Sequence, residues 1–569
     1  MKGRFLILLI VLPLLVLKGY SQNETNDSLL RDIVVQYGQA EVTIPFTNIR
    51  DIDNLTQKVS ISSVRNKLVY ISLSPLTVEW FILQRFDYSI IEEADSKGVV
   101  SAHNFIQVLE WDTYPYYSQY DSIMQSFIEL YPELCHLDTI GTSINGKLVL
   151  ALKISDNASI DEDEPEVFYS STIHGDELAG YVLMLRLADY LLKNYRTSNR
   201  VKNLVDDLEI WINPLANPDG TYRTGNTITS PTRFNANGYD LNRNFPDPIT
   251  PYSGSHIKQK ETIDMDRFMR EHNFVISANF HSGYEVVNYP WDKWYSVFHA
   301  DDLWFNSISR AYADTVHIYS GDAYLINKDN GVTRGAAWYR INGGRQDFVT
   351  GELQGREVTI EIDGIKNTPA AQLELLWQYN WRSFLGYFEN ALYGINGIVR
   401  DVVTSASVPA RIFINGHDID SSHVYSDTLT GRFVRLLSPG SWNLTFTAKG
   451  YLDTTVNNIT VFAGQRTDII IDMVPIINSV DTTNPESPVL YPNPASVEIR
   501  AVLPEVIMGS VNVRIINQSG KLISDYNTEV SKGVPLILDV KGLLDGSYSV
   551  VFTNTVSKTV FTGRFIVIK

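Results

Sequence analysis

The chain has 569 residues, a formal net charge of −18, and 44% hydrophobic and 20% charged residues. This length exceeds what one hydrophobic core can organise, so we expect several domains of ordinary globular composition. The strongly negative charge argues against a nucleic-acid partner. It is compatible with attraction of cationic peptides, although simple solubility is the simpler interpretation of charge alone.

The first 22 residues have the pattern of a secretory signal. Lys2 and Arg4 precede an almost unbroken apolar run from Phe5 to Leu17, which is short for a membrane-spanning helix. No later stretch is long and apolar enough to cross a membrane. We therefore expect an exported protein without a transmembrane segment, secreted or attached to the outer cell surface. Cys135 is the single cysteine, so no intrachain disulfide can form.

Residues 23–110 are predicted to form a small α/β unit. The stretch 59–74 alternates apolar and polar residues as a strand does, and apolar segments follow it. We interpret the unit as an accessory or pro-like domain, and no chemical motif is apparent in it.

Residues 111–392 have the pattern of an α/β domain. Helical spacing of apolar residues predicts helices over 118–131 and 178–195. Apolar runs predict buried strands over 167–173, 208–213, 274–280 and 357–362. Strands that alternate with helices favour a mixed, mainly parallel sheet with helices on both faces.

Two small all-β domains are expected after the α/β domain. Residues 395–474 contain short alternating strands separated by turns, which is typical of a β-sandwich. Residues 475–489 are polar and contain prolines, as a linker does. Residues 490–569 then form a second β-sandwich.

The most informative residues lie just past two of the predicted strands. His174 and Glu177 stand in one tight turn, and His281 lies about a hundred residues later. A catalytic zinc takes three protein ligands of these types and keeps a fourth position open for water. Ligands also bind at the carboxyl ends of strands in open α/β sheets. A short His-x-x-Glu pattern alone could arise by chance on a solvated turn, so a metal site needs support from polar residues elsewhere in the chain.

Several polar residues downstream fit the surroundings of such a metal. Arg233, Asn242 and Arg243 lie in one segment that could bind a carboxylate, because guanidinium groups pair with carboxylates in a bidentate fork. Asp240 could accept the free ring N–H of His174. For any one of these arginines, a salt-bridged surface loop is the simpler interpretation.

Two further residues complete the candidate site. Tyr339 precedes a double glycine and is expected on a mobile loop. Glu361 lies in an otherwise apolar strand, where an unpaired carboxylate is costly, so it is either paired structurally or functional. Beside a metal-activated water it would act as a general base.

These segments together resemble the zinc metallocarboxypeptidases, in particular their regulatory N/E branch, over residues 111–392. The resemblance rests on HGDE, RFNANGYDLNRNFPD, HSGYEVVNYPWD, WYRINGGRQDF and TIEI, in this order and spacing.

The resemblance implies a role for each residue of the candidate site. It implies one zinc ion per chain, held by His174, Glu177 and His281. It implies that Glu361 activates water and passes the proton to the leaving amine, and that Arg233 polarises the scissile carbonyl. Asn242 and Arg243 would hold the C-terminal carboxylate of a peptide or protein, and Tyr339 would close over the substrate.

The same branch suggests the specificity. Asp292 and Gln346 occupy the positions that suit a C-terminal lysine or arginine, although Asp292 could instead cap a loop. The chain departs from the usual pattern at four other positions, none of which is a metal ligand. They are Asp176 for asparagine, Ser282 for glycine, and Arg345 and Phe348 in the segment around Gln346. Arg345 is adjacent in sequence to Gln346 and puts the basic preference in doubt.

The β domains carry resemblances of their own. Residues 395–474 resemble the transthyretin-like domain of the N/E branch, and residues 490–569 resemble the C-terminal sorting domain of type IX secretion cargo. We therefore expect a monomeric, secreted zinc carboxypeptidase that acts on peptide or protein C-termini and meets the secretion machinery through its last domain. The alternatives are a peptidoglycan-peptide hydrolase with the same zinc site, and a catalytically silent adhesion or binding protein.

Overall fold

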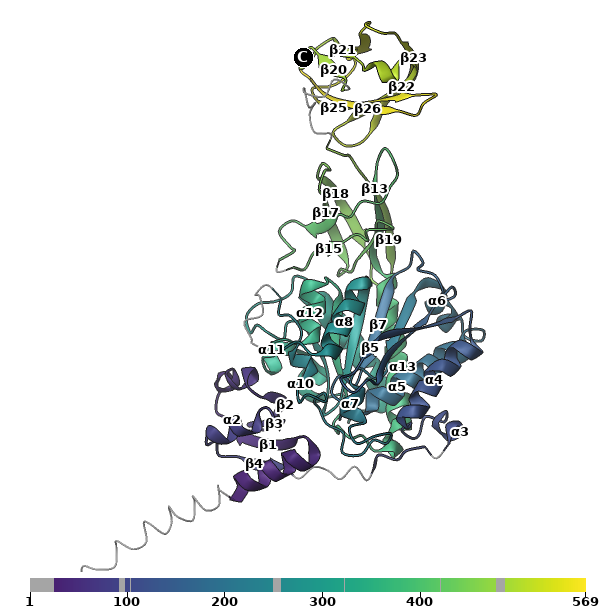
Figure 1. The fold of residues 1–569 in the computed structure, drawn as a ribbon. Helices are drawn as coiled ribbons and strands as arrows, with labels where there is room; N and C mark the ends of the chain where they lie inside the picture. The colour runs from purple at the N-terminus through teal and green to yellow at the C-terminus, as the bar shows by residue number, and fades with distance from the viewer. Residues whose placement is uncertain are drawn as a thin grey trace, which may run out of the picture.

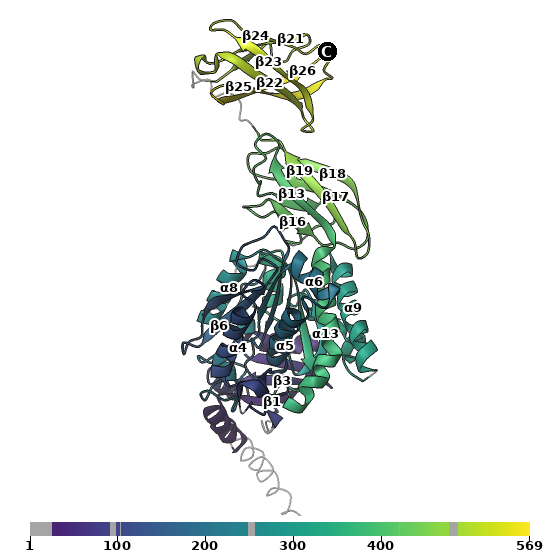
Figure 2. The same cartoon turned by 90° about the vertical axis from the view of Figure 1, so that its right-hand side faces the viewer.

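The computed structural model describes residues 25–91, 98–102, 104–248, 257–321, 323–419, 421–476 and 487–569. The predicted secretory signal, 1–22, lies outside the described residues. Figures 1 and 2 show a central α/β body with the N-terminal unit packed against one side and two β units stacked in line beyond it. Among the described residues, no helix combines the length and the apolar character needed to span a bilayer.

An eight-stranded sheet organises the central body, in the order β11-β10-β12-β9-β7-β8-β6-β5. The strands are β5 (Cys135–Thr142), β6 (Leu148–Ile154), β7 (Glu166–Ser171), β8 (Glu209–Asn213), β9 (Phe274–His281), β10 (Tyr284–Tyr289), β11 (Val332–Arg334) and β12 (Arg356–Asp363). The pairs β8–β7, β7–β9, β9–β12 and β10–β11 are parallel, and the remaining pairs are antiparallel. The predicted mixed sheet is therefore confirmed.

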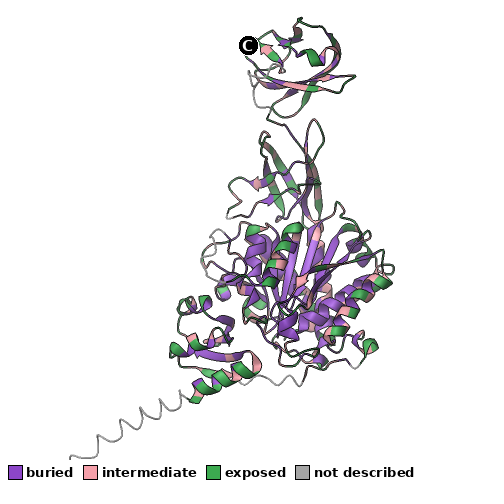
Figure 3. Ribbon diagram, in the orientation of Figure 1, coloured by how far each residue is buried: buried purple, intermediate pink, exposed green. Residues whose placement is uncertain are grey.

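Helices cover both faces of this sheet. One face carries α4 (Tyr117–Leu130), α5 (Ala179–Asn194), α6 (Asn199–Asp207), α9 (Asp302–Ser320) and α13 (Leu373–Glu389). The other face carries α8 (Lys260–Glu271) and α12 (Arg345–Glu352). Strand β7 shows why its sequence is apolar throughout: Tyr169 packs in the first layer and Phe168 in the second. Figure 3 shows this burial along the central strands.

Short helices occupy the connections of the body. They are α3 (Phe105–Val108), α7 (Pro218–Thr221), α10 (Asn327–Asn330), α11 (Gly335–Trp338) and the 3-10 turn η4 (Leu241–Arg243).

The N-terminal unit, which we define as residues 25–91, is a small four-stranded sheet with helices. Residues 25–37 form a helix, and the sheet order is β2-β3-β1-β4. The elements are β1 (Ala40–Pro45), β2 (Ser60–Arg65), β3 (Leu68–Leu73), α2 (Val78–Leu83) and β4 (Ser89–Ile91). Asn66 and Lys67 join β2 to β3 with φ of 52° and 60°, the positive values that a tight two-residue hairpin requires.

Each β unit pairs a three-stranded with a four-stranded sheet around its own core, as predicted. The first contains β13 (Gly394–Asp401), β14 (Arg411–Ile414), β15 (Val424–Tyr425), β16 (Arg432–Arg435), β17 (Gly440–Thr447), β18 (Thr454–Val461) and β19 (Arg466–Met473). The second contains β20 (Val489–Tyr491), β21 (Glu498–Val502), β22 (Gly509–Asn517), β23 (Leu522–Val530), β24 (Leu536–Asp539), β25 (Gly546–Asn554) and β26 (Val560–Val567).

A buried ionic junction joins the first β-sandwich to the central body. The carboxylate of Asp301 lies 2.8 Å from Arg356 Nη2 and 2.6 Å from Arg435 Nη1. Arg356 begins strand β12, whereas Arg435 ends strand β16 of the sandwich. Arg435 also reaches Asp418 of the sandwich, at 2.6 Å. The two domains therefore share one charge network without contact with solvent.

Candidate metal centre

His174 and Glu177 lie in the turn between β7 and α5, at the carboxyl edge of the sheet. The turn packs closely against the loop that contains Gly220. A Cβ atom on Gly175 would lie 2.3 Å from the backbone carbon of Gly220, so this position requires glycine. His281 ends strand β9, the neighbour of β7, which brings it to the same edge.

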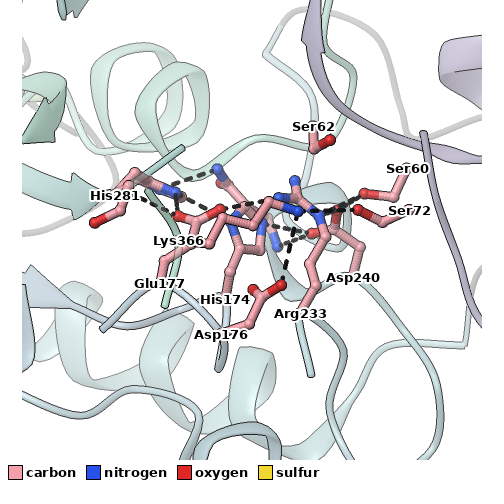
Figure 4. Close-up of polar contacts among 12 residues, drawn as sticks. Ser60, Ser62, Ser72, His174, Asp176, Glu177, Arg233, Asp240, His281 and Lys366 are labelled. Carbon is pink, nitrogen blue, oxygen red and sulfur yellow. Dashed lines mark hydrogen bonds and ion pairs between the residues drawn. The ribbon is translucent and has the colours of Figure 1, made fainter. Parts of the chain in front are cut away.

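The nitrogen and oxygen atoms of these three residues converge (Figure 4). His174 Nδ1 lies 3.1 Å from His281 Nδ1, and the two oxygens of Glu177 lie 2.9 Å and 2.7 Å from these nitrogens. Two nitrogens that bind one tetrahedral zinc at about 2.0–2.1 Å are roughly 3.3 Å apart. The donor types and their spacing therefore fit a zinc ion, and the predicted cofactor is confirmed.

Each of the two imidazoles also contacts a further residue through its Nε2 atom. His174 Nε2 lies 3.1 Å from Asp240 Oδ1. His281 Nε2 lies 2.9 Å from Asn279 Nδ2, and the oxygen of the same amide has no hydrogen-bond partner within the described part of the chain. With Nδ1 facing a metal, Nε2 carries the proton, and Asn279 Oδ1 can accept it after a half-turn of the amide. Sequence reasoning missed Asn279.

The surroundings of His281 and Glu177 favour the forms in which these two residues bind a metal. Burial lowers the pKa of His281 to about 4, which keeps the imidazole neutral. Burial acts to raise the pKa of Glu177, but His174 and His281 together hold it well below its usual range. A neutral imidazole and an ionised carboxylate are the forms that bind zinc.

Glu361 lies beside the metal ligands because strands β12 and β9 are paired in register. The parallel pairing places Glu361 opposite His281. Burial, and then the negative charge of Glu177, raise the pKa of Glu361 well above its usual range. Its Oε2 atom is buried and has no hydrogen-bond partner among the residues that the structure describes. The carboxylate is therefore not explained by a structural ion pair.

Arg233, Asn242 and Arg243 lie around the same centre. Arg233 contacts Glu177 Oε1 through Nη1 and Asp240 Oδ2 through Nε, both at 3.0 Å. Asn242 Nδ2 lies 3.5 Å from His281 Nε2. The Nη1 atom of Arg243 donates to the carbonyl of Asn242 at 2.9 Å.

Asp292 and Gln346 are both buried. Asp292 accepts a hydrogen bond from Asn288 Nδ2 at 2.9 Å, and burial raises its pKa to about 6. A Cβ atom on Gly335 would lie 1.7 Å from Asp292 Oδ1, so glycine provides the room for this carboxylate. Neither polar atom of the Gln346 side chain has a partner in the described ranges, nor does Asn288 Oδ1.

Arg345 does not add its charge to this group. Its guanidinium points into the core, where Nη2 pairs with Glu357 at 2.9 Å and both side chains are fully buried. The sequence left open whether the charge of Arg345 lies beside Gln346. The structure places this charge in the core instead. Phe348, another departure from the usual pattern, is a core residue.

Tyr339 and the N-terminal unit differ most from expectation. Tyr339 was expected on a mobile loop, but it is buried in a cluster with residues of the N-terminal unit, and its hydroxyl lies 3.4 Å from the carbonyl of Ile61. The same unit, in which no chemical motif was apparent, places Ser60 against Arg233 and Gln39 against Asp176. No sequence signal could reveal these contacts, because Gln39 and Arg233 are separated by 194 positions.

A His–Glu–His centre at the carboxyl edge of such a sheet, with a buried carboxylate beside it, places the chain among the metal-dependent hydrolases. Residues 120–383 match the family model described as zinc carboxypeptidase, and residues 489–569 match the secretion system C-terminal sorting domain. The chain is 31% identical to the mouse carboxypeptidase N catalytic chain over 398 residues, which is 62% of this chain and 84% of that protein. It belongs to the zinc carboxypeptidase family, as the sequence motifs predicted.

One further relative and one solved structure are also similar to this chain. Rat carboxypeptidase D is 33% identical over 380 residues, 64% of this chain, but the chain spans only 27% of the length of that relative. The solved carboxypeptidase A from Helicoverpa armigera has the same fold, with a TM-score of 0.50 and 19% identity over 61% of this chain and 96% of that one. The C-terminal match confirms the expectation of secretion or surface attachment.

Proposed function

We propose that the chain is a secreted zinc carboxypeptidase that removes single C-terminal residues, preferentially lysine or arginine, from peptides or proteins. The observation that carries the proposal is the convergence of His174, Glu177 and His281 beside the unpaired carboxylate oxygen of Glu361. A set of metal ligands alone could be structural. A buried, unpaired carboxylate next to them is costly unless it acts on a substrate or on water.

Glu361 and Arg233 have separate roles in the proposed reaction. When bound, zinc supplies a Lewis acid that polarises a carbonyl and lowers the pKa of water. Glu361 takes a proton from the attacking water and passes it to the leaving amine. Arg233, which stays charged because Asp240 and Glu177 face it, stabilises negative charge that develops on the carbonyl oxygen.

Asn242 and Arg243 restrict cleavage to the end of a chain. They offer an amide and a guanidinium to one terminal carboxylate, which is the pairing that guanidinium geometry favours. Tyr339 packs over the substrate once its present contact with Ile61 is released.

The preference for a basic residue follows from Asp292 and Gln346. Asp292 is 3% exposed and Gln346 is 1% exposed, and the amide of Gln346 lacks a partner in the described residues. A buried carboxylate and the buried, unpaired amide of Gln346 suit a substrate cation, because each of these groups is costly to bury without a partner. An apolar C-terminal residue would offer no counter-ion to Asp292 and no partner to the amide of Gln346.

The β domains have no proposed catalytic role. Residues 395–474 act as a transthyretin-like support of the catalytic domain, and residues 490–569 engage the secretion machinery. The first role is supported by the buried junction at Asp301, and the second by the family match.

The test is hydrolysis of dipeptides that end in arginine, phenylalanine or glutamate, with and without a zinc chelator. The protein is assayed as the full chain and after cleavage at an engineered site between residues 91 and 98. We expect chelator-sensitive release of arginine in preference to the other residues. Hydrolysis that survives complete removal of zinc, or none in either form of the protein, would refute the proposal.

A further inference from the structure

The segment that carries Asp292 has no strand to hold it. Strand β10 ends at Tyr289, and residues 291–293 belong to no helix or strand. The backbone groups of such a segment need partners elsewhere, because a buried N–H or carbonyl without a hydrogen bond is costly. The position of the Asp292 carboxylate, which the proposed function assigns to a substrate cation, therefore depends on these partners.

One side chain, that of Asp347, binds two backbone N–H groups of this segment. Its Oδ1 atom accepts from the N–H of Asp292 and its Oδ2 atom accepts from the N–H of Lys293, each at 2.9 Å. The carbonyls are held separately: Ile341 N–H donates to Asp292 at 3.1 Å, and Arg340 Nε donates to Lys293 at 2.7 Å. Asp347 is 2% exposed, so water has little access to take its place as the acceptor.

The first turn of helix α12, which contains Asp347, is itself fixed to the rest of the site. The backbone N–H of Arg345 donates to Asn242 Oδ1 at 2.9 Å. The guanidinium of Arg345 pairs with Glu357 of β12 at 2.9 Å, which anchors the turn to the central sheet. Asp347 therefore connects the segment of Asp292 to a rigid part of the catalytic domain.

We propose that Asp347 is a positioning residue for the basic preference: it holds the backbone of Asp292 and Lys293, and so fixes the point at which the Asp292 carboxylate meets the substrate cation. The inference rests on the proposed function, from which it takes the role of Asp292. Asp347 acts through Asp292 and does not touch the substrate. Hydrogen bonds from N–H groups to a carboxylate are among the stronger ones, which suits this role.

Replacement of Asp347 by asparagine removes one of the two hydrogen bonds at constant shape. The new oxygen can still accept one N–H, but the new amide nitrogen is a donor and meets the other N–H. We expect kcat/KM on an arginine-terminated dipeptide to fall by about ten-fold or more, mainly through KM, because substrate binding is disturbed and the chemical groups at the metal are not. On a phenylalanine-terminated dipeptide, kcat/KM should change by less than about two-fold.

The ratio of these two kcat/KM values, which we call the arginine preference, is the quantity to compare. Any change in access to the metal centre that affects both substrates equally cancels in this ratio. An arginine preference that is unchanged in Asp347→Asn would overturn the inference.

A double-mutant cycle tests whether Asp347 acts through Asp292. Asp292→Asn alone already removes the charge that the substrate cation would meet. Asp347→Asn should therefore cause no further loss of the arginine preference in the Asp292→Asn background. Losses that multiply in the double variant would show that Asp347 acts independently, and would overturn the inference.

A series of substrates gives a readout that reports position. Dipeptides that end in ornithine, lysine or arginine place their cation at different distances from the backbone. A fixed carboxylate discriminates among them, whereas a displaced one does so less. The spread of kcat/KM across the series should narrow in Asp347→Asn, and an unchanged spread would contradict a positioning role.

Asp401→Asn is the matched control for stability. Asp401 is 6% exposed and accepts from the N–H groups of Val403 and Thr404, at 2.7 Å and 2.8 Å, but it lies in the first β-sandwich. Both variants should lower Tm, and only Asp347→Asn should lower the arginine preference. Equal losses of the arginine preference in the two variants would attribute the effect to stability and overturn the inference.

A second variant tests the same segment if Asp347→Asn does not fold. Arg340→Met removes the donor to the carbonyl of Lys293, and the Arg340 side chain is 28% exposed, so its loss is easier to tolerate. We expect the arginine preference to fall by about two- to five-fold, and not at all in the Asp292→Asn background. No loss in otherwise wild-type protein would overturn the inference.

Wild-type protein separates this inference from the proposed function. A wild type without an arginine preference would refute the proposed specificity, and with it the role of Asp347. A wild type with this preference, together with Asp347→Asn that retains it, would refute the role of Asp347 alone.

Discussion

Replacement of Asp292 by asparagine provides a sharp test of specificity. The carboxylate is 3% exposed, is held by Asn288 Nδ2, and fits a space that exists because residue 335 is glycine. Asn288 can keep its hydrogen bond to the new side-chain oxygen, and the shape is unchanged, so Asp292→Asn removes the charge alone. The variant isolates the ion pair with a substrate cation.

The size of the effect follows from burial. Loss of one partner of a buried charge pair costs roughly 2–5 kcal/mol, because the other charge stays desolvated. This corresponds to about a thirty- to several-thousand-fold loss of kcat/KM on arginine-terminated substrates. Phenylalanine-terminated substrates carry no cation at this position, so their kcat/KM should change little and serve as the control.

The pH dependence of the same preference gives an independent check. Burial raises the pKa of Asp292 to about 6, so the carboxyl group is ionised above this pH and becomes neutral below it. The wild-type preference for arginine over phenylalanine should therefore fall as the pH drops through about 6, and should be flat in Asp292→Asn. A wild-type enzyme that cleaves phenylalanine better than arginine at pH 7 would refute the specificity assignment.

Four further predictions concern the metal, the base, export and the junction. Elemental analysis should find one zinc per chain, and active protein without metal would contradict the site. Glu361→Gln should bind zinc and fold but lose turnover by about a hundred-fold or more, and near-normal turnover would show that another group acts as base. Removal of residues 490–569 should leave hydrolysis intact but retain the protein inside the producing cell, whereas normal secretion would favour an adhesion module. Arg435→Met should lower the free energy of unfolding by about 3–5 kcal/mol, measured by denaturant titration, while Arg411→Met on an exposed strand position of the same sandwich should change little.

The sequence predicted the parts of the fold that local pattern determines. Strands such as β7 and β9 are short, mostly apolar runs because both of their faces are covered, and such runs stand out between helices. His174, Glu177 and His281 were predictable because metal ligation fixes residue types at strand ends. Asp240 was predictable for a related reason, since a ring N–H needs an acceptor.

Contacts between distant segments were not predictable. The side chain of Arg345 points into the core because it pairs with Glu357 of strand β12. The sequence around Arg345 gives no signal of this distant partner. The location of residues 25–91 depends on contacts such as Ser60 with Arg233, to which neither segment gives a local signal. Periodicity and spacing describe each element separately, so they cannot show which element covers another.

The junction at Asp301 has a consequence for the order in which the chain folds during synthesis. Strand β12 begins at Arg356, and the buried carboxylate beside it is fully balanced only when Arg435 arrives from the sandwich. A chain that emerges from its N-terminus presents residues 25–91 early and Arg435 much later. The sheet that carries Glu361 therefore reaches its final stability only after the sandwich that supplies Arg435 has been synthesised.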